Sequence, residues 1–143
     1  MPKITTLPEE YKPSKDEEYM CENQLEYFRQ KLLQWKSSLL MESQETLNHL
    51  KEENANEADF NDRASSETER TFELRTRDRS RKLQEKIDEA LKRIQNREYG
   101  YCEETGDPIG IRRLEARPIA TLCIEAQMRH ENYEKNHLDE PQS

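Results

Sequence analysis

The sequence predicts a mainly α-helical protein: a long antiparallel coiled-coil hairpin with a small degenerate zinc-finger module and a C-terminal helix. Three observations favour this fold. Apolar residues recur at steps of three and four along two long segments, as in a coiled-coil seam. All three glycines fall between Gly100 and Gly110, where turns replace the helical pattern. Two cysteines, Cys102 and Cys123, each occupy the first position of a degenerate C-x-x-C pair.

The composition agrees with a thin helical structure rather than a large round core. Of 143 residues, 31% are hydrophobic and 38% are charged, so each helix is expected to bury one narrow stripe. The net charge of −8 argues against autonomous binding to DNA or RNA, which depends on neutralising phosphates. An odd number of cysteines without a signal peptide predicts the reducing cytoplasm, and the short apolar runs predict no membrane insertion.

The first half of the hairpin follows a polar N-terminal stretch. Residues 1–17 are predicted to form a flexible arm, and residues 18–97 the hairpin. A helix is expected to begin near Ser14, a plausible cap followed by acidic residues, and to end around residues 54–56. Its seam is formed by Leu25, Phe28, Leu32, Trp35 and Leu39, and continues more weakly through Ser43, Leu47 and Leu50.

The second half returns from a polar tip near residues 55–64, where Asp62 is a good candidate N-cap. Its apolar positions are Phe72, Thr76, Leu83, Ile87, Ala90 and Ile94. Helices of this length span about 50 Å, and the short connector implies antiparallel pairing. Residues 42–69 are strongly acidic and residues 75–97 strongly basic. The simplest explanation is two solvated faces that pair with each other.

The module covers residues 98–126, and a C-terminal helix and tail cover residues 123–143, with the helix starting near Cys123. The zinc positions that remain are Cys102, Thr105, Cys123 and Ala126. Threonine is a poor zinc ligand and alanine cannot be one, so no metal is expected. The predicted core of the module is Tyr99, Tyr101, Ile109, Ile111, Leu114, Ile119, Leu122 and Ile124.

Two alternatives for the cysteines stay open. Zn²⁺ could be held by the two thiolates together with His130 or water, or Cys102 and Cys123 could form a redox-active pair. The two cysteines are expected to lie close together, since each holds the first place of its half-site. Cys21, on the first helix, is interpreted as an inert helix residue.

Several long motifs in this chain resemble the DksA family of bacterial RNA polymerase-binding transcription factors. They are residues 59–64, 73–83, 99–102 and 109–118, with Cys123 and Ile124 beyond, and the similarity runs from about Glu18 to His130. The resemblance implies a non-enzymatic regulator whose hairpin enters the secondary channel of RNA polymerase and alters open-complex stability. It also implies a part in the stringent response: with ppGpp, repression of ribosomal RNA promoters and activation of some biosynthetic promoters.

The resemblance also implies particular site residues. The family tip motif D-x-x-D-x-A corresponds here to Asp59, Asp62 and Ala64, and the ppGpp-binding residues to Arg79, Leu83, Lys86 and Arg117. A further family lysine is replaced by Gln127, which removes one phosphate contact. Family members that lack some zinc cysteines fold and act without the metal, and this chain is similar to them.

Three other functions compete with this interpretation. A transcript-cleavage factor of the Gre type shares the hairpin shape, and a structural coiled-coil adaptor would need no polymerase. A thiol oxidoreductase is the weakest alternative, because the two cysteines do not form a C-x-x-C centre. A monomer is expected, since the hairpin satisfies its own seam.

Overall fold

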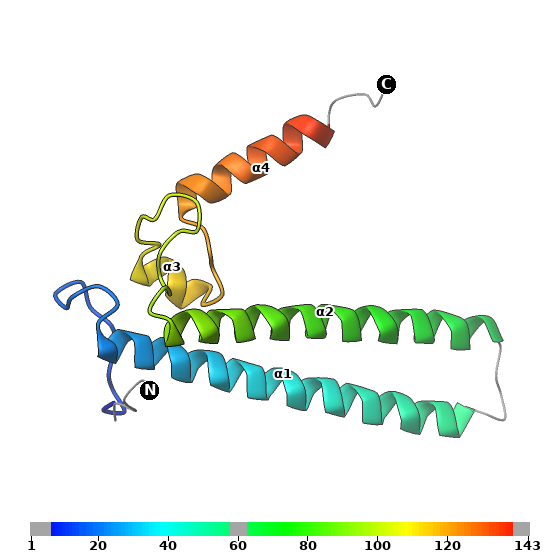
Figure 1. Ribbon diagram of the computed structural model, residues 1–143. Helices are drawn as coiled ribbons and strands as arrows, with labels where there is room; N and C mark the ends of the chain where they lie inside the picture. The colour runs from blue at the N-terminus through cyan, green and yellow to red at the C-terminus, as the bar shows by residue number, and fades with distance from the viewer. Residues whose placement is uncertain (1–6, 58–62, 139–143) are drawn as a thin grey trace. The chain divides into compact units, whose positions relative to one another are not determined.

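A computed structural model describes residues 7–57 and 63–138, with side chains for residues 7–49, 51–52 and 67–136. Four helices follow one another: α1 (Glu22–Glu57), α2 (Arg63–Gln95), α3 (Ile111–Ala116) and α4 (Ile124–Leu138) (Figure 1). In the described part of the chain, the β-type pairing is a single antiparallel bridge between Tyr101 and Pro108. The predicted mainly helical class is therefore confirmed. No described helix combines the length and apolar character needed to cross a membrane.

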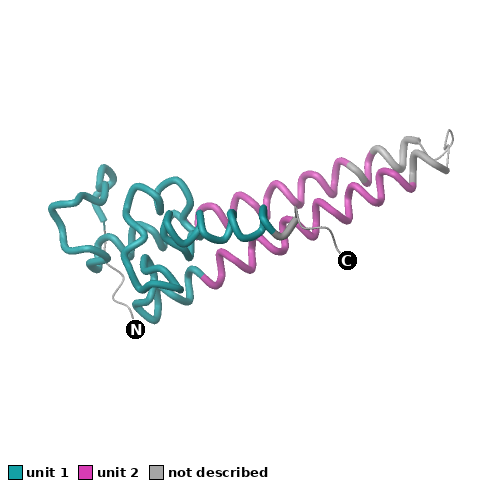
Figure 2. Tube along the Cα trace, turned by 90° about the horizontal axis from the view of Figure 1, so that it is seen from above, with its two compact units in different colours: residues 1–31, 90–143 teal, residues 32–89 magenta. Residues whose placement is uncertain are grey.

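The chain divides into two compact units (Figure 2). We call residues 32–89 the hairpin unit, and residues 1–31 with 90–143 the globular unit. Both long helices contribute to both units, because α1 and α2 each extend past the boundary. The module and α4 belong entirely to the globular unit.

The hairpin unit consists of α1 and α2 lying side by side (Figure 2). Lys36 Nζ lies 2.6 Å from Asp88 Oδ1, and Ser43 Oγ lies 2.8 Å from Ser80 Oγ. The two contacts advance in opposite directions along the helices, as antiparallel pairing requires. Each helix contributes one fully buried seam residue to this unit, Leu32 or Ile87.

Burial along the seam decreases toward the middle of the hairpin unit. Trp35, Leu39, Leu47 and Leu83 are half-buried. Phe72, predicted as a seam residue, is 65% exposed, so that assignment was wrong. The spacing places Phe72 near the seam, but its ring lies at the surface, and Thr76, one turn further along α2, is half-buried.

The core of the globular unit joins the ends of the long helices to the module. Phe28 and Tyr99 are fully buried and their ring centroids lie 5.6 Å apart, while Tyr99 donates a hydrogen bond to the Pro118 carbonyl at 2.7 Å. Tyr27 Oη donates to Glu115 Oε1 at 2.7 Å, which ties α3 to α1. Of the predicted module core, Tyr99, Ile109, Leu114 and Ile119 are buried.

Ile124 departs from the predicted module core, because 57% of it is exposed. It is the first residue of α4, and Ala126 two positions later is fully buried. Two steps along an α-helix turn a side chain about 200°, so the two residues face opposite directions. The start of α4 at Ile124 confirms the prediction of a helix near Cys123.

Helix α1 begins at Glu22, later than the start predicted near Ser14. The predicted cap exists as an isolated turn: the Ser14 N–H donates to Glu17 Oε1 at 3.2 Å, and the Glu17 N–H donates to the Ser14 carbonyl at 3.4 Å. The turn cannot continue into the helix because Met20 has φ 55°, a left-handed conformation. Gln24 then caps α1 by accepting the Met20 N–H at 2.8 Å.

Tyr19 connects this N-terminal segment to the module. Its hydroxyl donates to the Gly100 carbonyl at 2.6 Å and accepts the Gly110 N–H at 2.9 Å. Gly100 has φ 92°, and a Cβ atom there would lie 2.7 Å from Met20 Cγ. Glycine is therefore required at this position both by the backbone conformation and by the close approach of the segment.

Candidate functional site

The tip motif lies where the two long helices are joined. Asp59 and Asp62, including the predicted N-cap, lie outside the described residues, and Ala64 falls in the first turn of α2. Helix α1 ends at Glu57, slightly later than predicted, and α2 begins at Arg63. The connector therefore comprises residues 58–62, which contain both aspartates of the motif.

Two large apolar side chains on α2 are exposed near this end of the hairpin unit. Phe72 is 65% exposed and Leu74 is 60% exposed. Two positions apart, they point to different sides of the helix, so the exposed apolar surface is not confined to the seam edge. The sequence analysis did not identify Leu74 as an exposed apolar residue. Its position outside the three-and-four spacing of the seam indicated that it would not be buried there.

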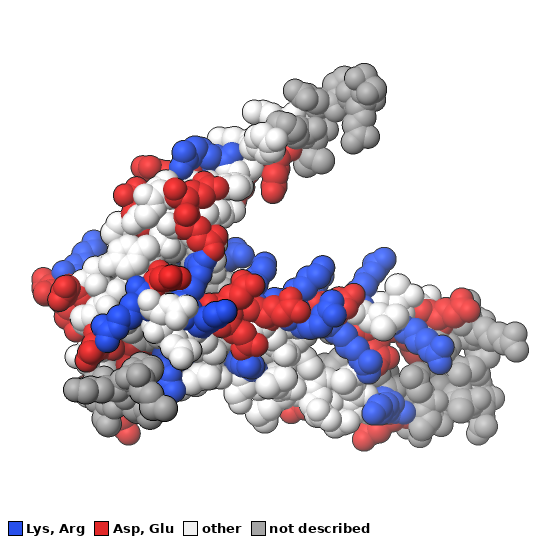
Figure 3. Space-filling model, in the orientation of Figure 1, with Lys and Arg blue, Asp and Glu red and all other residues white. Residues whose placement is uncertain are grey.

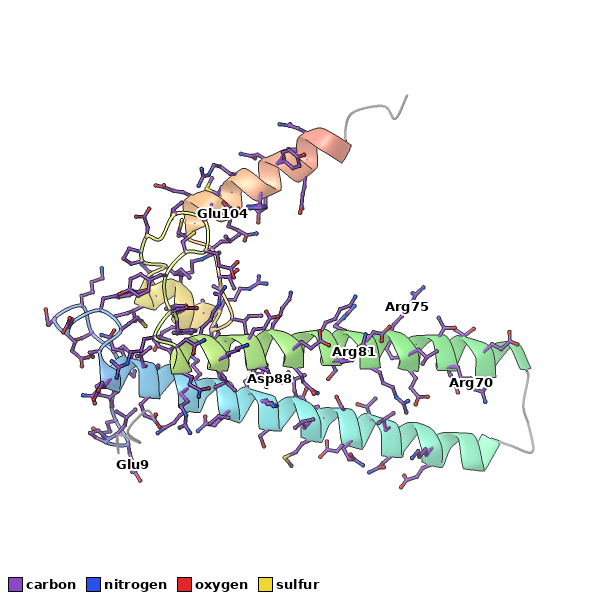
Figure 4. The ribbon with its side chains drawn as sticks, viewed as in Figure 1. Glu9, Arg70, Arg75, Arg81, Asp88 and Glu104 are labelled. Atoms are coloured by element: carbon purple, nitrogen blue, oxygen red, sulfur yellow. The ribbon has the colours of Figure 1, made fainter. Side chains whose placement is uncertain are left out.

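A stripe of four basic side chains runs along α2. Arg75, Arg79, Lys82 and Lys86 follow one another at steps of four, three and four, so they share one face, and all four are exposed. Figure 3 shows Lys and Arg side chains along α2, and Figure 4 shows Arg75 pointing away from α1. Among the described residues, none of the four forms an ion pair.

Neighbouring arginines on α2 behave differently. Arg77 pairs with Glu73 at 2.8 Å, and Arg81 approaches Asp78 at 3.7 Å. The described ion pair between the helices of this unit, Lys36–Asp88, places the base on α1 and the acid on α2. Lys36 lies outside residues 42–69, so this pair does not test the prediction that the acidic and basic stretches pair with each other.

The four residues implied in ppGpp binding are divided between the two units. Arg79 and Lys86 belong to the exposed stripe on α2, and Leu83 lies half-buried beside them. Arg117 belongs to the globular unit, where its backbone N–H closes the end of α3 on the Arg113 carbonyl at 2.8 Å. Gln127, at the position of the missing lysine, donates to Glu131 Oε1 at 3.2 Å on α4.

The two module cysteines are buried and lie close together, as predicted. Thr105 Oγ1 lies 3.9 Å from Cys123 Sγ, and the Thr105 hydroxyl is also close enough to Cys102 to lower the pKa of its thiol. The Glu103 N–H donates to the Thr121 carbonyl at 2.9 Å and so joins the two cysteine turns. Thr105, which occupies the position of the second cysteine in the first C-x-x-C pair, thus lies near both sulfurs.

The sulfur of Cys102 has an unusual electrostatic environment. Burial opposes its ionisation, but hydrogen bonds from the Thr105 hydroxyl and from the backbone N–H groups of Cys123, Thr105 and Glu104 outweigh burial and lower the pKa of Cys102 to about 6. The sequence interpretation found no mark of an activated thiol here. The signal was Thr105 itself, since a hydroxyl in a ligand position can donate to the neighbouring sulfur.

The residues at the four zinc positions do not fit a tetrahedral zinc site. They supply two sulfurs, a threonine hydroxyl and the methyl group of Ala126, whereas structural zinc takes four ligands. His130, considered as a third ligand, contacts Glu104 through Nε2 instead. Throughout the described residues, no three His, Cys, Asp or Glu side chains come together as a metal site would require.

A cavity of about 370 Å³ lies in the globular unit, lined by Arg93, Arg97, Glu98, Tyr101, Cys102 and Glu103. Its two arginines are already engaged, since Arg93 pairs with Glu103 and Arg97 lies 3.4 Å from Glu22. The two guanidinium groups are therefore compensated, and neither is left unpaired to attract an anion.

Comparison with known proteins identifies both parts of the chain. Residues 24–94 match the family described as DnaK suppressor protein DksA, N-terminal domain, and residues 97–132 match the prokaryotic dksA/traR C4-type zinc finger. The RNA polymerase-binding transcription factor DksA of Caulobacter vibrioides is 61% identical over 131 residues, which cover 92% of each chain. Its namesake in Escherichia coli is 48% identical over 127 residues, 89% of this chain and 84% of that protein.

A solved structure agrees with these sequence matches. The transcription factor DksA2 of Pseudomonas aeruginosa superposes with a TM-score of 0.72 at 41% sequence identity, covering 82% of this chain and 90% of that one. The match confirms the predicted fold class, and the sequence relatives confirm the resemblance drawn from the motifs. The chain belongs to the DksA family of RNA polymerase-binding transcription factors.

Proposed function

We propose that this protein regulates transcription by binding RNA polymerase through its secondary channel and placing its acidic tip near the active site. The observation that carries the proposal is the hairpin unit, two long antiparallel helices whose connector holds Asp59 and Asp62. Its relatives are named RNA polymerase-binding transcription factors, and that name includes no catalytic activity. We place the protein in the cytoplasm and expect it to act as a monomer.

The mechanism follows from the thin cross-section of two helices. Such a pair is about 20 Å across, which is narrower than a globular domain, so it can enter a channel that excludes the globular unit. Carboxylates at its end can then interact with basic polymerase groups or with the magnesium-bearing centre. A shift in open-complex stability would repress ribosomal RNA promoters and favour some biosynthetic promoters.

The same proposal assigns ppGpp to the basic face of α2. Arg79 and Lys86 are exposed on one face, and guanidinium and ammonium groups suit a polyphosphate. Leu83 borders them on α2, and the resemblance to the family also assigns Arg117, which belongs to the globular unit. Gln127 carries no charge, so we expect weaker enhancement by ppGpp than in a relative with lysine at this position.

The test is transcription in vitro from a ribosomal RNA promoter with purified polymerase, this protein and ppGpp. Asp62→Asn is expected to abolish most of the repression while leaving polymerase binding within about fivefold, because the loss of one charge typically changes binding by about 1 kcal/mol or less. Asp78→Asn is the matched control, since it makes the same change at an exposed position on α2. Equal repression by the wild type and Asp62→Asn would contradict the role of the tip.

The effector site has its own paired test. Arg79→Ala and Lys86→Ala should each reduce the enhancement by ppGpp several-fold without changing repression in its absence. Arg77→Ala is the control, because Arg77 is already paired with Glu73. A loss of enhancement in Arg77→Ala as large as in Arg79→Ala would show that general positive charge, rather than this face, is responsible.

Transcript cleavage is measured with the same purified polymerase and protein. The Gre-type alternative gains no support from the relatives, which are named transcription factors. We expect backtracked complexes to be cleaved at the same rate with and without the protein, and faster cleavage would reverse this assignment.

A further inference from the structure

We propose that Cys102 and Cys123 form a two-coordinate thiolate site for a soft monovalent cation, Cu(I), at the place where related modules have a four-cysteine zinc site. The inference concerns the metal chemistry of the globular unit and is independent of the proposed action on polymerase. It rests on three features of the module: where the two sulfurs are held, which other ligands are missing, and which groups donate to the sulfurs.

The backbone holds the two sulfurs next to each other. The first cysteine turn is closed by the Gly106 N–H on the Cys102 carbonyl at 2.9 Å, and it is joined to the second by the Glu103 N–H on the Thr121 carbonyl at 2.9 Å. Thr105, in the first cysteine turn, reaches the second through Oγ1, which lies 3.9 Å from Cys123 Sγ. No large rearrangement is therefore needed for one ion to contact both.

The donor set suits a coordination number of two. Ala126 is fully buried with a methyl group at the fourth ligand position, and His130 is turned to Glu104. Thiolates are soft ligands that select Cu(I), which is stable with two of them, whereas zinc requires further donors. The described residues offer these two sulfurs without a third strong ligand.

The surroundings also stabilise the charge of the complex. Binding joins Cu(I) to both cysteines as thiolates, which gives a complex with a net charge of −1; any proton still held by either sulfur is released to solvent, and no oxidation state changes. The N–H groups of Cys123, Thr105 and Glu104 and the Thr105 hydroxyl already donate to the sulfur of Cys102. Such donors around the ligands typically strengthen metal sites. Both cysteines are themselves buried, as is Ala126 at the fourth ligand position.

The experiment titrates the full, reduced chain with Cu(I) under anaerobic conditions against the chromophoric chelator bathocuproine disulfonate. We expect one Cu(I) per chain, with two sulfur neighbours in X-ray absorption. Cys102→Ser and Cys123→Ser should each weaken binding more than about 100-fold, because loss of a ligand exceeds the loss of a supporting contact. Cys21→Ser is the matched control and should bind like the wild type, since Cys21 lies outside the module near Glu17.

Several outcomes would overturn the proposal. The proposal is wrong if the chelator removes all the Cu(I), if one ion binds per two chains, if Cys21→Ser weakens Cu(I) binding, or if Zn²⁺ binds as tightly as Cu(I). Circular dichroism shows whether each serine variant is folded. If one is not, the wild type decides by itself: two sulfur neighbours support the site, and three sulfurs or added nitrogen ligands contradict it.

A second variant sharpens the assignment. Ala126→Cys adds a third sulfur at the buried fourth position, so its affinity for Zn²⁺ should rise at least about tenfold relative to the wild type. Ag(I), a surrogate that is not oxidised in air, should raise the melting temperature of the wild type and of Cys21→Ser but not of Cys123→Ser. An equal shift in all three would show that silver binds elsewhere.

Discussion

The two units of this protein are stabilised in different ways. In the hairpin unit, a periodic seam with two fully buried apolar residues, Leu32 and Ile87, holds together helices that are otherwise polar. In the globular unit, Phe28, Tyr99 and Leu114 are fully buried, and tyrosine hydroxyls bond specific carbonyls. The comparison indicates that the seam of the hairpin unit preserves its length and surface charge, whereas specific contacts in the globular unit fix the positions of individual residues.

The largest expected effect comes from replacing one phenylalanine by alanine in each unit. Phe28→Ala in the globular unit should lower the free energy of unfolding by about 3–5 kcal/mol, because Phe28 is fully buried. Phe72→Ala in the hairpin unit should change it by less than about 0.5 kcal/mol, because Phe72 is 65% exposed. Urea denaturation followed by circular dichroism measures both. Similar losses in the two variants would mean that the seam is packed at Phe72 after all.

A smaller effect separates backbone strain from close packing in the globular unit. Gly100→Ala should destabilise by about 2 kcal/mol, since alanine is strained at positive φ and its Cβ would meet Met20. Gly106→Ala is the control, because its φ is 75° but no atom lies within 4 Å of the new methyl group. It should cost about 1 kcal/mol. Thermal melting measures both. Equal destabilisation by the two substitutions would show that the segment around Met20 moves aside without a cost in free energy.

A titration tests the environment of Cys102 directly. The pKa of about 6, against 9.0 for the unperturbed thiol, predicts a thiolate absorbance near 240 nm that rises with a midpoint near pH 6 and is absent in Cys102→Ser. Because the folded pKa is lowered, the ionised thiol stabilises the fold fully above pH 9, and this stabilisation is lost as the pH falls from 9 through 6.

The role of Thr105 in this titration has a separate check. Thr105→Val removes the hydroxyl that bonds the sulfur of Cys102 while keeping the shape of the side chain, so the midpoint should move upward. Thr121→Val serves as the control. An unchanged midpoint in Thr105→Val would assign the effect to the backbone N–H groups alone.

The smallest effect is expected from the ion pair of the hairpin unit. Lys36→Ala removes the contact with Asp88, whose side chain is 54% exposed. Pairs at such positions contribute about 0.2–1 kcal/mol, and salt screens them. A double-mutant cycle with Asp88→Ala at low and high salt measures the coupling. A coupling above this range that persists in high salt would make the hairpin unit dependent on specific contacts, as the globular unit is.

Sequence patterns predicted the hairpin well because the pairing of two helices depends on local spacing. Leu25, Phe28 and Leu32 at steps of three and four are buried, as are Ile87, Ala90 and Ile94. The same reasoning failed at Phe72, where the spacing is correct but the ring is exposed, because spacing along one helix does not fix how closely the partner helix packs against it. For the candidate site, the motifs identified the basic positions on α2 but not which of those bases are already paired, because pairing depends on side-chain geometry.

The amino-acid sequence by itself determined the helical class, the antiparallel hairpin, the incomplete set of zinc ligands and the family, because spacing and motifs are properties of short segments. Only the tertiary structure decided where α1 begins, how Tyr19 bonds Gly100 across 81 positions, and that Thr105 lies near both sulfurs. These features join residues that are distant in the chain. Their energies depend on which side chains and backbone groups the folded chain brings together, so the spacing of residues along the chain does not predict them.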